Sequence, residues 1–167
     1  MIVQATAADL PLIYQLFEEA IDYQRENNYI GWKTYDKGFI QNDIENGYSF
    51  KVTTNGTVTG IFSICLSDAL IWREKEKADS IYLHRIVVNR AQKNSALFAT
   101  VLDWAKQYAA DNHLRYIRMD TWALNAKIID YYKSYGFHFV EEYITPNTTD
   151  LPEQHRNLHI ALLEMIV

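Results

Sequence analysis

The length, composition and charge of the chain predict one domain and exclude several classes of protein. Its 167 residues, 49% of them hydrophobic, suffice for one sizeable core and are too few to favour two independent domains, so we expect a single domain over residues 1–167. The net charge of −5, with acidic and basic residues interspersed, argues against a nucleic-acid partner, although a few local cations still suit a phosphorylated small molecule.

Cysteine usage and hydrophobic runs indicate where the protein works. Cys65 is the single cysteine, which excludes an intrachain disulfide framework and favours a reducing compartment. The N-terminal residues lack the basic and apolar regions of a signal peptide, and no segment approaches the roughly 18 apolar residues of a membrane span. We therefore expect a cytoplasmic protein with no membrane partner.

Hydrophobic periodicity predicts strands and helices that alternate along the chain. Thr6 and Asp9 are capping candidates for the first helix, and Asn55-Gly56 supplies the positive φ angles of a tight hairpin turn. Residues 72–80 (WREKEKADS) are a charged connection, which favours a solvated loop or frayed helix. The predicted elements are a strand at 2–5, a helix ending near Asn27, a helix at 36–45, a hairpin at 48–68, a strand at 81–88, a helix at 95–112, a strand at 115–122, a helix at 125–134, and strands at 137–143 and 158–167.

This order predicts an α/β fold of α+β character. Crossover helices favour parallel strand pairing whereas the hairpin is antiparallel, so we expect a central mixed sheet of about seven strands flanked by about four helices. The second hairpin strand is nearly all apolar around residues 61–66, which favours a central position. A dinucleotide-binding fold is not indicated, because its glycine fingerprint is absent.

The segment from Ile86 to Phe98 (IVVNRAQKNSALF) leads from a strand into a helix without a glycine. A helix that begins just past a strand leaves unpaired backbone N–H groups at the positive end of its dipole, which suits an anion such as a phosphate. Arg90 or Lys93 adds positive charge there. An ordinary strand–helix turn with exposed cations explains the same residues.

A second segment follows the next strand and contains Asn125, then Tyr132, then Tyr135-Gly136-Phe137. With LHRIVVNRAQKNSALFATVLDWAKQYA and the order of elements, this N…Y…GF pattern resembles the GCN5-related N-acetyltransferase (GNAT) superfamily over nearly the whole chain. The alternative explanation is local, with tyrosines as core aromatics of an amphipathic helix and Gly136 as its C-terminal cap.

The resemblance implies that the coenzyme contacts both segments. In the family, an Arg/Gln-x-x-Gly-x-Gly/Ala loop holds the pyrophosphate of acetyl-CoA with backbone amides. The corresponding positions are Lys93, Ala96 and Phe98, so both glycines are absent, and Phe98 alternatively faces the core. Main-chain N–H groups donate whatever the side chain is. The expected coenzyme contacts are Ile86, Val87, Val88, Lys93, Asn94, Ser95, Ala96, Leu97, Phe98, Asn125 and Tyr132.

Acetyl transfer from a thioester to an amine needs a polarised carbonyl, an acceptor for the amine proton and a donor for the thiolate. The resemblance implies a bulged strand whose free amide, near Val88, meets the thioester carbonyl. Tyr132 is the expected general acid, because transfer from a phenol with a pKa of about 10 to a thiolate of about 8.5 is nearly balanced. His84 is the expected base, since histidine titrates in the useful range; a hydrogen-bonded structural role is the alternative.

The acceptor side is expected at the connection between the first two helices, which selects substrates in the family. Tyr29 and Trp32 in this connection suit a cationic amine with an apolar body. Tyr82 shares a strand face with His84 by alternation, and Asp120 and Trp122 end the next strand. Core packing or a dimer contact explains the aromatic connection equally well.

We therefore expect an acetyl-CoA-dependent N-acetyltransferase that uses no metal. It acts on a primary amine of a small molecule or a peptide N-terminus, by direct attack in a ternary complex. The missing glycines support an alternative, a non-catalytic acyl-CoA-binding sensor or interaction module with this fold. A structural protein with no cofactor is a third reading, and a homodimer is left open.

Overall fold

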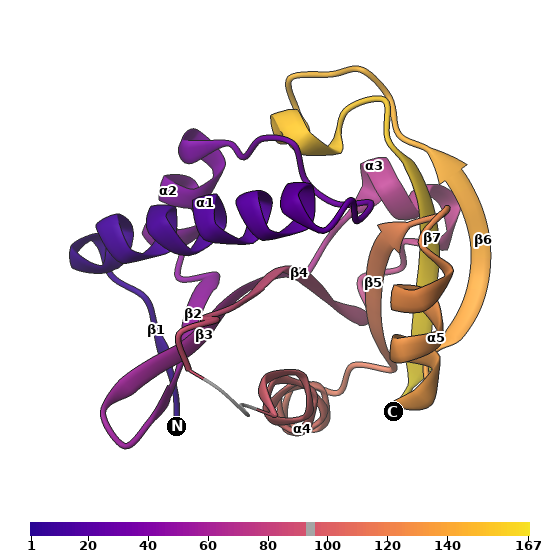
Figure 1. Ribbon diagram of the computed structural model, residues 1–167. Helices are drawn as coiled ribbons and strands as arrows, with labels where there is room; N and C mark the ends of the chain where they lie inside the picture. Colours follow the sequence, from indigo (N-terminus) through magenta and orange to yellow (C-terminus); the bar gives the residue numbers. More distant parts are fainter. Residues whose placement is uncertain (93–95) are drawn as a thin grey trace. The chain divides into compact units, whose positions relative to one another are not determined.

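The structure, a computed structural model, describes residues 1–92 and 96–167. In this part of the chain the strands and helices follow the predicted order, with one extra short helix, α3 (Figure 1). The elements are β1 (Ile2–Gln4), η1 (Ala7–Asp9), α1 (Leu10–Glu26), α2 (Lys37–Glu45), β2 (Ser49–Thr54), β3 (Thr57–Cys65), α3 (Ala69–Trp72), η2 (Arg73–Lys75), β4 (Ser80–Val88), α4 (Leu97–Asp111), β5 (Tyr116–Trp122), α5 (Ala126–Ser134), β6 (His138–Ile144), η3 (Glu153–His155) and β7 (His159–Ile166), where η denotes a 3-10 turn.

The strands form a seven-stranded mixed sheet in the order β1-β2-β3-β4-β5-β7-β6. The β4–β5 pair is parallel, whereas the pairs β1–β2, β2–β3, β5–β7 and β6–β7 are antiparallel. The β2–β3 turn has φ of +50° at Asn55 and +79° at Gly56, as the hairpin prediction requires. The predicted mixed sheet is therefore confirmed.

The described residues divide into two compact units. Unit 1 comprises Met1–Ile64 and His84–Trp104, and unit 2 comprises Cys65–Leu83 and Ala105–Val167. Both β4 and α4 begin in one unit and end in the other. The single domain expected from the chain length stays a prediction.

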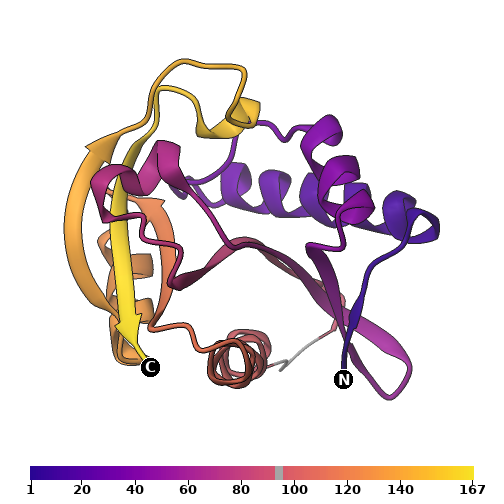
Figure 2. The ribbon, with the colours of Figure 1, turned by 180° about the vertical axis from the view of Figure 1, so that it is seen from behind.

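In unit 1, both faces of β3 are covered by helices. Ile61 belongs to a cluster with Phe17 of α1 and Ile40 of α2. The next residue, Phe62, meets the ring of Trp104 in α4, with centroids 5.3 Å apart. Successive strand side chains point to opposite faces, so a strand covered on both sides is apolar throughout. Both views show α1 and α2 on one side of β2 and β3, and α4 on the other (Figure 1, Figure 2).

In unit 2, the charged connection at residues 72–80 is less solvated than its composition predicts. Trp72 is 0% exposed and packs in a cluster with Ile160 and Leu162 of β7. Arg73 forms an ion pair with Glu141 of β6. Of the two alternatives, the solvated loop is wrong for this end of the segment, because the Trp72 indole is buried and Arg73 pairs with β6. Short helical turns, the end of α3 at Trp72 and η2 at Arg73–Lys75, are found there.

No helix in the described ranges combines the length and the apolar character that a membrane crossing requires.

Candidate active site

Strand β4 contains an irregularity at Arg85, whose φ is +50°. Left-handed backbone is rare for a residue with a side chain, and it costs conformational energy. The backbone at Arg85 therefore departs from regular extended geometry inside β4. This irregularity lies three residues before Val88, and the free amide expected near Val88 stays a prediction.

A buried ion pair holds this irregularity. The guanidinium of Arg85 bonds the carboxylate of Asp43 in α2, and the two side chains are 8% and 10% exposed. Arg85 Nε has no hydrogen-bond partner among the described residues, so the guanidinium relies on this pair. The local backbone strain is therefore maintained by a contact with α2.

The parallel ladder between β4 and β5 is short. Within the described chain, it joins Ser80–Tyr82 to Tyr116–Arg118, although β4 continues to Val88. The later backbone groups of β4 take no part in this ladder. Val87 is buried and packs against the α1–α2 cluster, whereas Val88 is 41% exposed.

The start of α4 lies close to β3 because Gly60 has no side chain. A Cβ at Gly60 would lie 2.5 Å from Leu97 Cδ2 and 2.8 Å from the Val87 carbonyl oxygen. The backbone N–H of Thr100 donates to the carbonyl of Ala96 at 3.0 Å. The amides just before Thr100 therefore belong to the first turn of α4, where backbone N–H groups lack intrahelical acceptors. Leu97 and Phe98 have buried side chains, so only the backbone groups of these two residues can contact a coenzyme.

The expected contacts at Lys93, Asn94 and Ser95 lie outside the described residues. The turn before them is anchored by Asn89, whose backbone N–H donates to Thr59 at 2.9 Å and whose Nδ2 donates to Val58 at 2.8 Å. The Arg90 guanidinium lies over the ring of Tyr23 in α1, 3.2 Å from its centroid. Arg90, one of the two cations expected to attract a phosphate, is therefore stacked on an aromatic ring.

The end of α5 positions Tyr132. Gly136 has φ of +100°, its N–H donates to Lys133 at 2.9 Å, and the Phe137 N–H donates to the Tyr132 carbonyl at 3.4 Å. This pair of bonds is a Schellman motif, so Gly136 is the predicted C-terminal cap. The rings of Tyr132 and Phe137, 6.4 Å apart, supply the apolar contact that accompanies the motif.

The phenol of Tyr132 is held in its protonated form. Burial raises the pKa of Tyr132 well above the ordinary phenol value, and the neighbouring Tyr131 and Asp120 raise it further. Burial and a hydrogen bond with Tyr135 raise the pKa of Tyr131 to about 12. A raised pKa makes full proton transfer to a thiolate more uphill than the balanced transfer expected from ordinary values.

The end of β5 and the start of α5 bring together the other predicted site residues of unit 2. The Asn125 side chain accepts from the Ile128 N–H at 3.2 Å and so caps α5, the alternative role that its position suggested. The Asn125 N–H donates to the Trp122 carbonyl at 3.1 Å. Asp120 and Trp122 are half-buried at this strand end.

The two aromatic residues expected on the acceptor side differ in their surroundings. Tyr29 is 49% exposed and its ring meets Tyr23 edge-on, with centroids 5.8 Å apart. Trp32 packs against Phe17 of the unit 1 core at 5.3 Å, and its backbone N–H donates to Gln24. Tyr29 therefore remains available to a ligand, whereas Trp32 fills the core on at least one face.

Tyr82 does not fit the expected acceptor contact. Its side chain is 0% exposed, and its hydroxyl accepts from the buried guanidinium of Arg118 at 3.2 Å. Burial raises the pKa of Tyr82, and a hydrogen bond to Glu76 raises it further. Alternation predicts that Tyr82 and His84 share a strand face. Because this part of β4 is buried on both faces, sharing that face does not bring Tyr82 to the surface.

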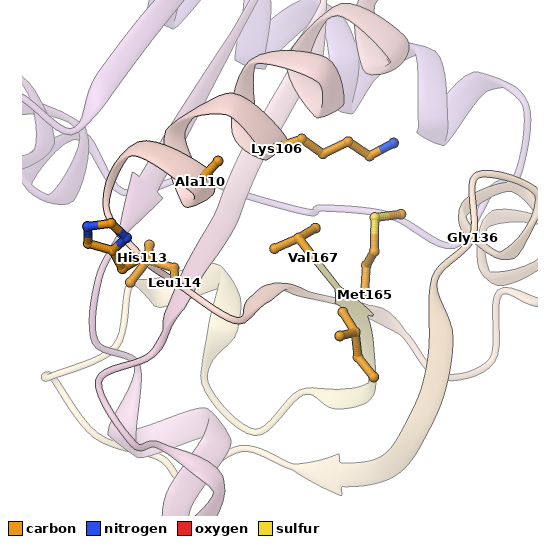
Figure 3. Close-up of a pocket in the computed structure, with 8 residues that line it drawn as sticks. Lys106, Ala110, His113, Leu114, Gly136, Met165 and Val167 are labelled. Atoms are coloured by element: carbon orange, nitrogen blue, oxygen red, sulfur yellow. The ribbon is translucent and has the colours of Figure 1, made fainter.

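A surface pocket of about 720 Å³ lies elsewhere in unit 2 (Figure 3). Its walls include Lys106 of α4, Leu114 and Met165. Met165 pairs with Ile117 near the start of β5, whereas Trp122 ends that strand. The pocket therefore lies at the opposite end of β5 from the predicted acceptor residues, and the proposed chemistry does not use it.

Comparison with known proteins assigns the family. The family model for the GNAT acetyltransferases matches residues 13–137. The chain belongs to the GNAT family. A GNAT protein of this kind is an acetyltransferase that uses acetyl-CoA.

Individual relatives agree with this assignment. The chain is 25% identical to the uncharacterized N-acetyltransferase YesJ of Bacillus subtilis, over 81% of this chain and 80% of YesJ. A GNAT acetyltransferase structure from Listeria monocytogenes has a TM-score of 0.79 at 21% identity, covering 100% of this chain and 94% of that one. The structure of yncA from Salmonella typhimurium, solved with its cofactor acetyl-CoA, has a TM-score of 0.65 at 19% identity, with 99% and 92% covered.

Proposed function

We propose that this GNAT protein transfers the acetyl group of acetyl-CoA to a primary amine of a small molecule or a peptide N-terminus, by direct attack in a ternary complex. The observation that carries the proposal is the short ladder at Ser80–Tyr82, followed by the held irregularity at Arg85. These features leave the later backbone groups of β4 outside that ladder. An extended ligand that pairs with β4 like an added strand needs such backbone groups. A cytoplasmic location, suggested by the lone thiol of Cys65, and a homodimer remain proposals.

The described residues fit the phosphate-bearing coenzyme at the start of α4. The close approach at Gly60 fixes the first turn of α4, whose amides carry the positive end of the helix dipole. Arg90, stacked on Tyr23, adds a cation to the preceding turn. In our proposal these amides and this cation bind the phosphates, while the backbone at Ile86, Val87 and Val88 aligns the pantetheine arm.

Tyr132 and His84 take the proton-handling roles in the proposed reaction. The amine nitrogen forms its bond to the acetyl carbon as the carbon–sulfur bond breaks. His84 accepts the amine proton, directly or through water, and Tyr132, as the general acid, transfers its O–H proton to the departing sulfur, so that CoA leaves as the thiol and the phenolate regains a proton from solvent. Because burial keeps Tyr132 protonated, this phenol is always ready to donate a hydrogen bond at neutral pH.

The residues still proposed for acceptor binding are Tyr29, Asp120 and Trp122. The exposed ring of Tyr29 suits the apolar body or the charge of an amine. The carboxylate of Asp120 suits an ammonium group before it loses its proton. Tyr82 is no longer proposed for this role because its side chain is fully buried.

Thermal unfolding with candidate ligands tests the coenzyme assignment without a known acceptor. A ligand that binds the native state raises Tm by mass action, so acetyl-CoA and CoA are expected to raise Tm while NAD and ATP leave it unchanged. A Tm that does not respond to saturating acetyl-CoA would contradict the proposal and support a protein with no cofactor.

Substitution of Tyr132 tests the chemical assignment. The variant Tyr132→Phe keeps the aromatic packing on Phe137 and removes the hydroxyl, so kcat is expected to fall about 10²- to 10⁴-fold while acetyl-CoA binding persists. The matched control is Tyr131→Phe, which removes the more exposed hydroxyl one residue earlier and is expected to keep activity. Equal activity in both variants would remove Tyr132 from the mechanism.

The acyl-CoA sensor is the second candidate, and the absence of glycine at Ala96 and Phe98 favours it. A sensor binds acyl-CoA but releases no thiol with any amine. The same Tm series, combined with a thiol-release assay over a broad amine panel, separates the two candidates.

A further inference from the structure

The surface pocket near the start of β5 has the size of a ligand site, although the proposed acetyl transfer does not use it. Its volume of about 720 Å³ falls within the range of about 300–1,000 Å³ that is typical of small-molecule pockets. Its walls come from the second half of α4, the turn after α4, the residue that ends α5, and the end of β7. All of these segments belong to unit 2, so the pocket lies within one compact unit.

The floor and rim of this pocket are mostly apolar. Met165 is 7% exposed and Leu114 is half-buried, so these two side chains form the floor, whereas Ile166 at the rim is 72% exposed. A Cβ at Gly136 would lie 3.5 Å from Met165 Cε, so the lack of a side chain at Gly136 leaves the space beside Met165 open. A thioether makes favourable contacts with aromatic rings. The floor therefore suits an apolar ligand body, and an aromatic one in particular.

Lys106 of α4 gives the pocket a positive charge. No acidic side chain lines the pocket, and within residues 1–92 and 96–167 the Lys106 ammonium forms no ion pair, hydrogen bond or ring contact, with Val167 or any other residue. Figure 3 shows the Lys106 side chain extended away from α4 on the side of Gly136, with His113 at the other end of this wall. A cation beside an apolar floor favours a ligand that joins an anionic head group to an apolar body.

His113 lines the pocket from an unusual backbone position. Its φ is +56°, its N–H donates to the Ala110 carbonyl at 3.2 Å, and the Leu114 N–H donates to the Ala109 carbonyl at 2.9 Å. These two bonds form a Schellman motif, in which the left-handed residue is usually glycine. Histidine at this position costs conformational energy that glycine would not, and it places an imidazole on the pocket wall.

The spacing of Lys106 and His113 limits the shape of the ligand. Seven residues separate them, which corresponds to about 10 Å along a helix axis. One carboxylate cannot contact both side chains over this interval. A two-ring aromatic acid has a comparable length, so its head group can meet Lys106 while its far ring lies beside His113.

We propose that this pocket binds a small monocarboxylate with a flat apolar body, such as a two-ring aromatic acid. The carboxylate pairs with Lys106, the rings lie on Leu114 and Met165, and His113 packs against the far ring. This inference goes beyond the proposed function and does not depend on it, because it involves neither the coenzyme nor the acceptor.

A charged probe and its neutral analogue test the head-group assignment. The probes are naphthalene-2-carboxylate and naphthalene-2-carboxamide, and isothermal titration measures their Kd. For the wild type we expect the carboxylate to bind about tenfold more tightly, because only the carboxylate forms a charge-assisted pair with Lys106. In Lys106→Met, which keeps an unbranched apolar side chain, this ratio is expected to fall to about 1. The matched control Lys77→Met, an exposed lysine of unit 2 outside the pocket, is expected to keep it.

Equal affinity of the two probes in the wild type, or a ratio that is unchanged in Lys106→Met, overturns the inference. The absence of saturable binding of either probe overturns it as well.

Replacement of His113 separates a ligand contact from a purely structural role. His113→Gly relieves the left-handed backbone, so Tm without ligand is expected to rise by about 2–4 °C. The same change removes the imidazole, so both probes are expected to bind about threefold more weakly. A raised Tm with unchanged probe affinity would overturn the proposed contact of His113 with the far ring.

Two further measurements locate the bound probe. Ala110→Phe fills the pocket from an exposed position of α4 and is expected to abolish saturable binding of both probes. Saturating acetyl-CoA is expected to leave the Kd of the carboxylate unchanged, because the coenzyme phosphates are proposed to bind the first turn of α4 and the pocket begins only at Lys106. Retained binding in Ala110→Phe, or competition by acetyl-CoA, would show that the probe binds elsewhere and would contradict the inference.

Discussion

Arg85 of β4 and Asp43 of α2 form a buried ion pair at the irregularity of β4. Removing one partner leaves the other charge buried and unpaired, so Arg85→Ala or Asp43→Asn is expected to lower the free energy of unfolding by about 3–5 kcal/mol. Urea unfolding measures this loss. The irregularity is proposed to expose β4 to the coenzyme, so acetyl-CoA binding should also weaken.

The matched control is the exposed pair of Arg25 and Asp22 on α1, whose side chains are 71% and 55% exposed. Solvent screens such a pair, so Arg25→Ala is expected to change the free energy of unfolding by less than about 1 kcal/mol. Equal losses in Arg85→Ala and Arg25→Ala would show that burial of the Arg85 pair has no energetic consequence.

Gly60 allows α4 to begin against β3. In Gly60→Ala the new methyl would collide with Leu97 and the Val87 carbonyl, so we expect a loss of about 1–3 kcal/mol and a shift of the first turn of α4. Acetyl-CoA titration should then show weaker binding. The control Gly38→Ala, inside α2, is expected to stay within about 1 kcal/mol of the wild type because alanine favours helix. Unaltered stability and binding in Gly60→Ala would refute the close-packing role.

Alkaline pH should destabilise the protein through its buried phenols. The pKa values of Tyr82 and Tyr132 are raised by burial, so the folded state holds these protons more tightly than the unfolded state, whose value is about 10. The stabilisation is complete below pH 10 and is lost as pH rises above it, by up to about 1.4 kcal/mol per pH unit for each group. Urea unfolding between pH 8 and pH 12 measures the slope. Tyr132→Phe is expected to flatten it, and an unchanged slope would contradict the burial of this phenol.

The sequence predicted the elements well where local chemistry determines them. Asn55-Gly56 forms the hairpin turn, Gly136 ends α5, and Asn125 caps its start, because each of these residues acts on its own backbone. The apolar run of β3 correctly indicated a strand covered on both faces. The pattern of Asn125, Tyr132 and Gly136-Phe137 indicated the family because these residues lie within one short segment, where their spacing can be read directly from the sequence.

Long-range contacts set the features that the sequence did not predict. The pairing of Arg85 with Asp43 depends on how α2 packs against β4. An arginine inside the apolar run LHRIVV does signal a buried charge, but it does not identify the partner. Tyr82 alternates with its neighbours as expected, but the burial of both strand faces puts it in the core. The side-chain amide of Gln154, which has no hydrogen-bond partner among the described residues, has no sequence signal, because its burial depends on how residues 145–158 fold.

Release of free thiol from acetyl-CoA in the presence of a panel of primary amines and peptides tests the central claim most directly. We expect amine-dependent thiol release by the wild type with at least one acceptor class, and its loss in Tyr132→Phe with acetyl-CoA binding intact. Tight acetyl-CoA binding without thiol release over the whole panel would contradict the account and favour the acyl-CoA sensor.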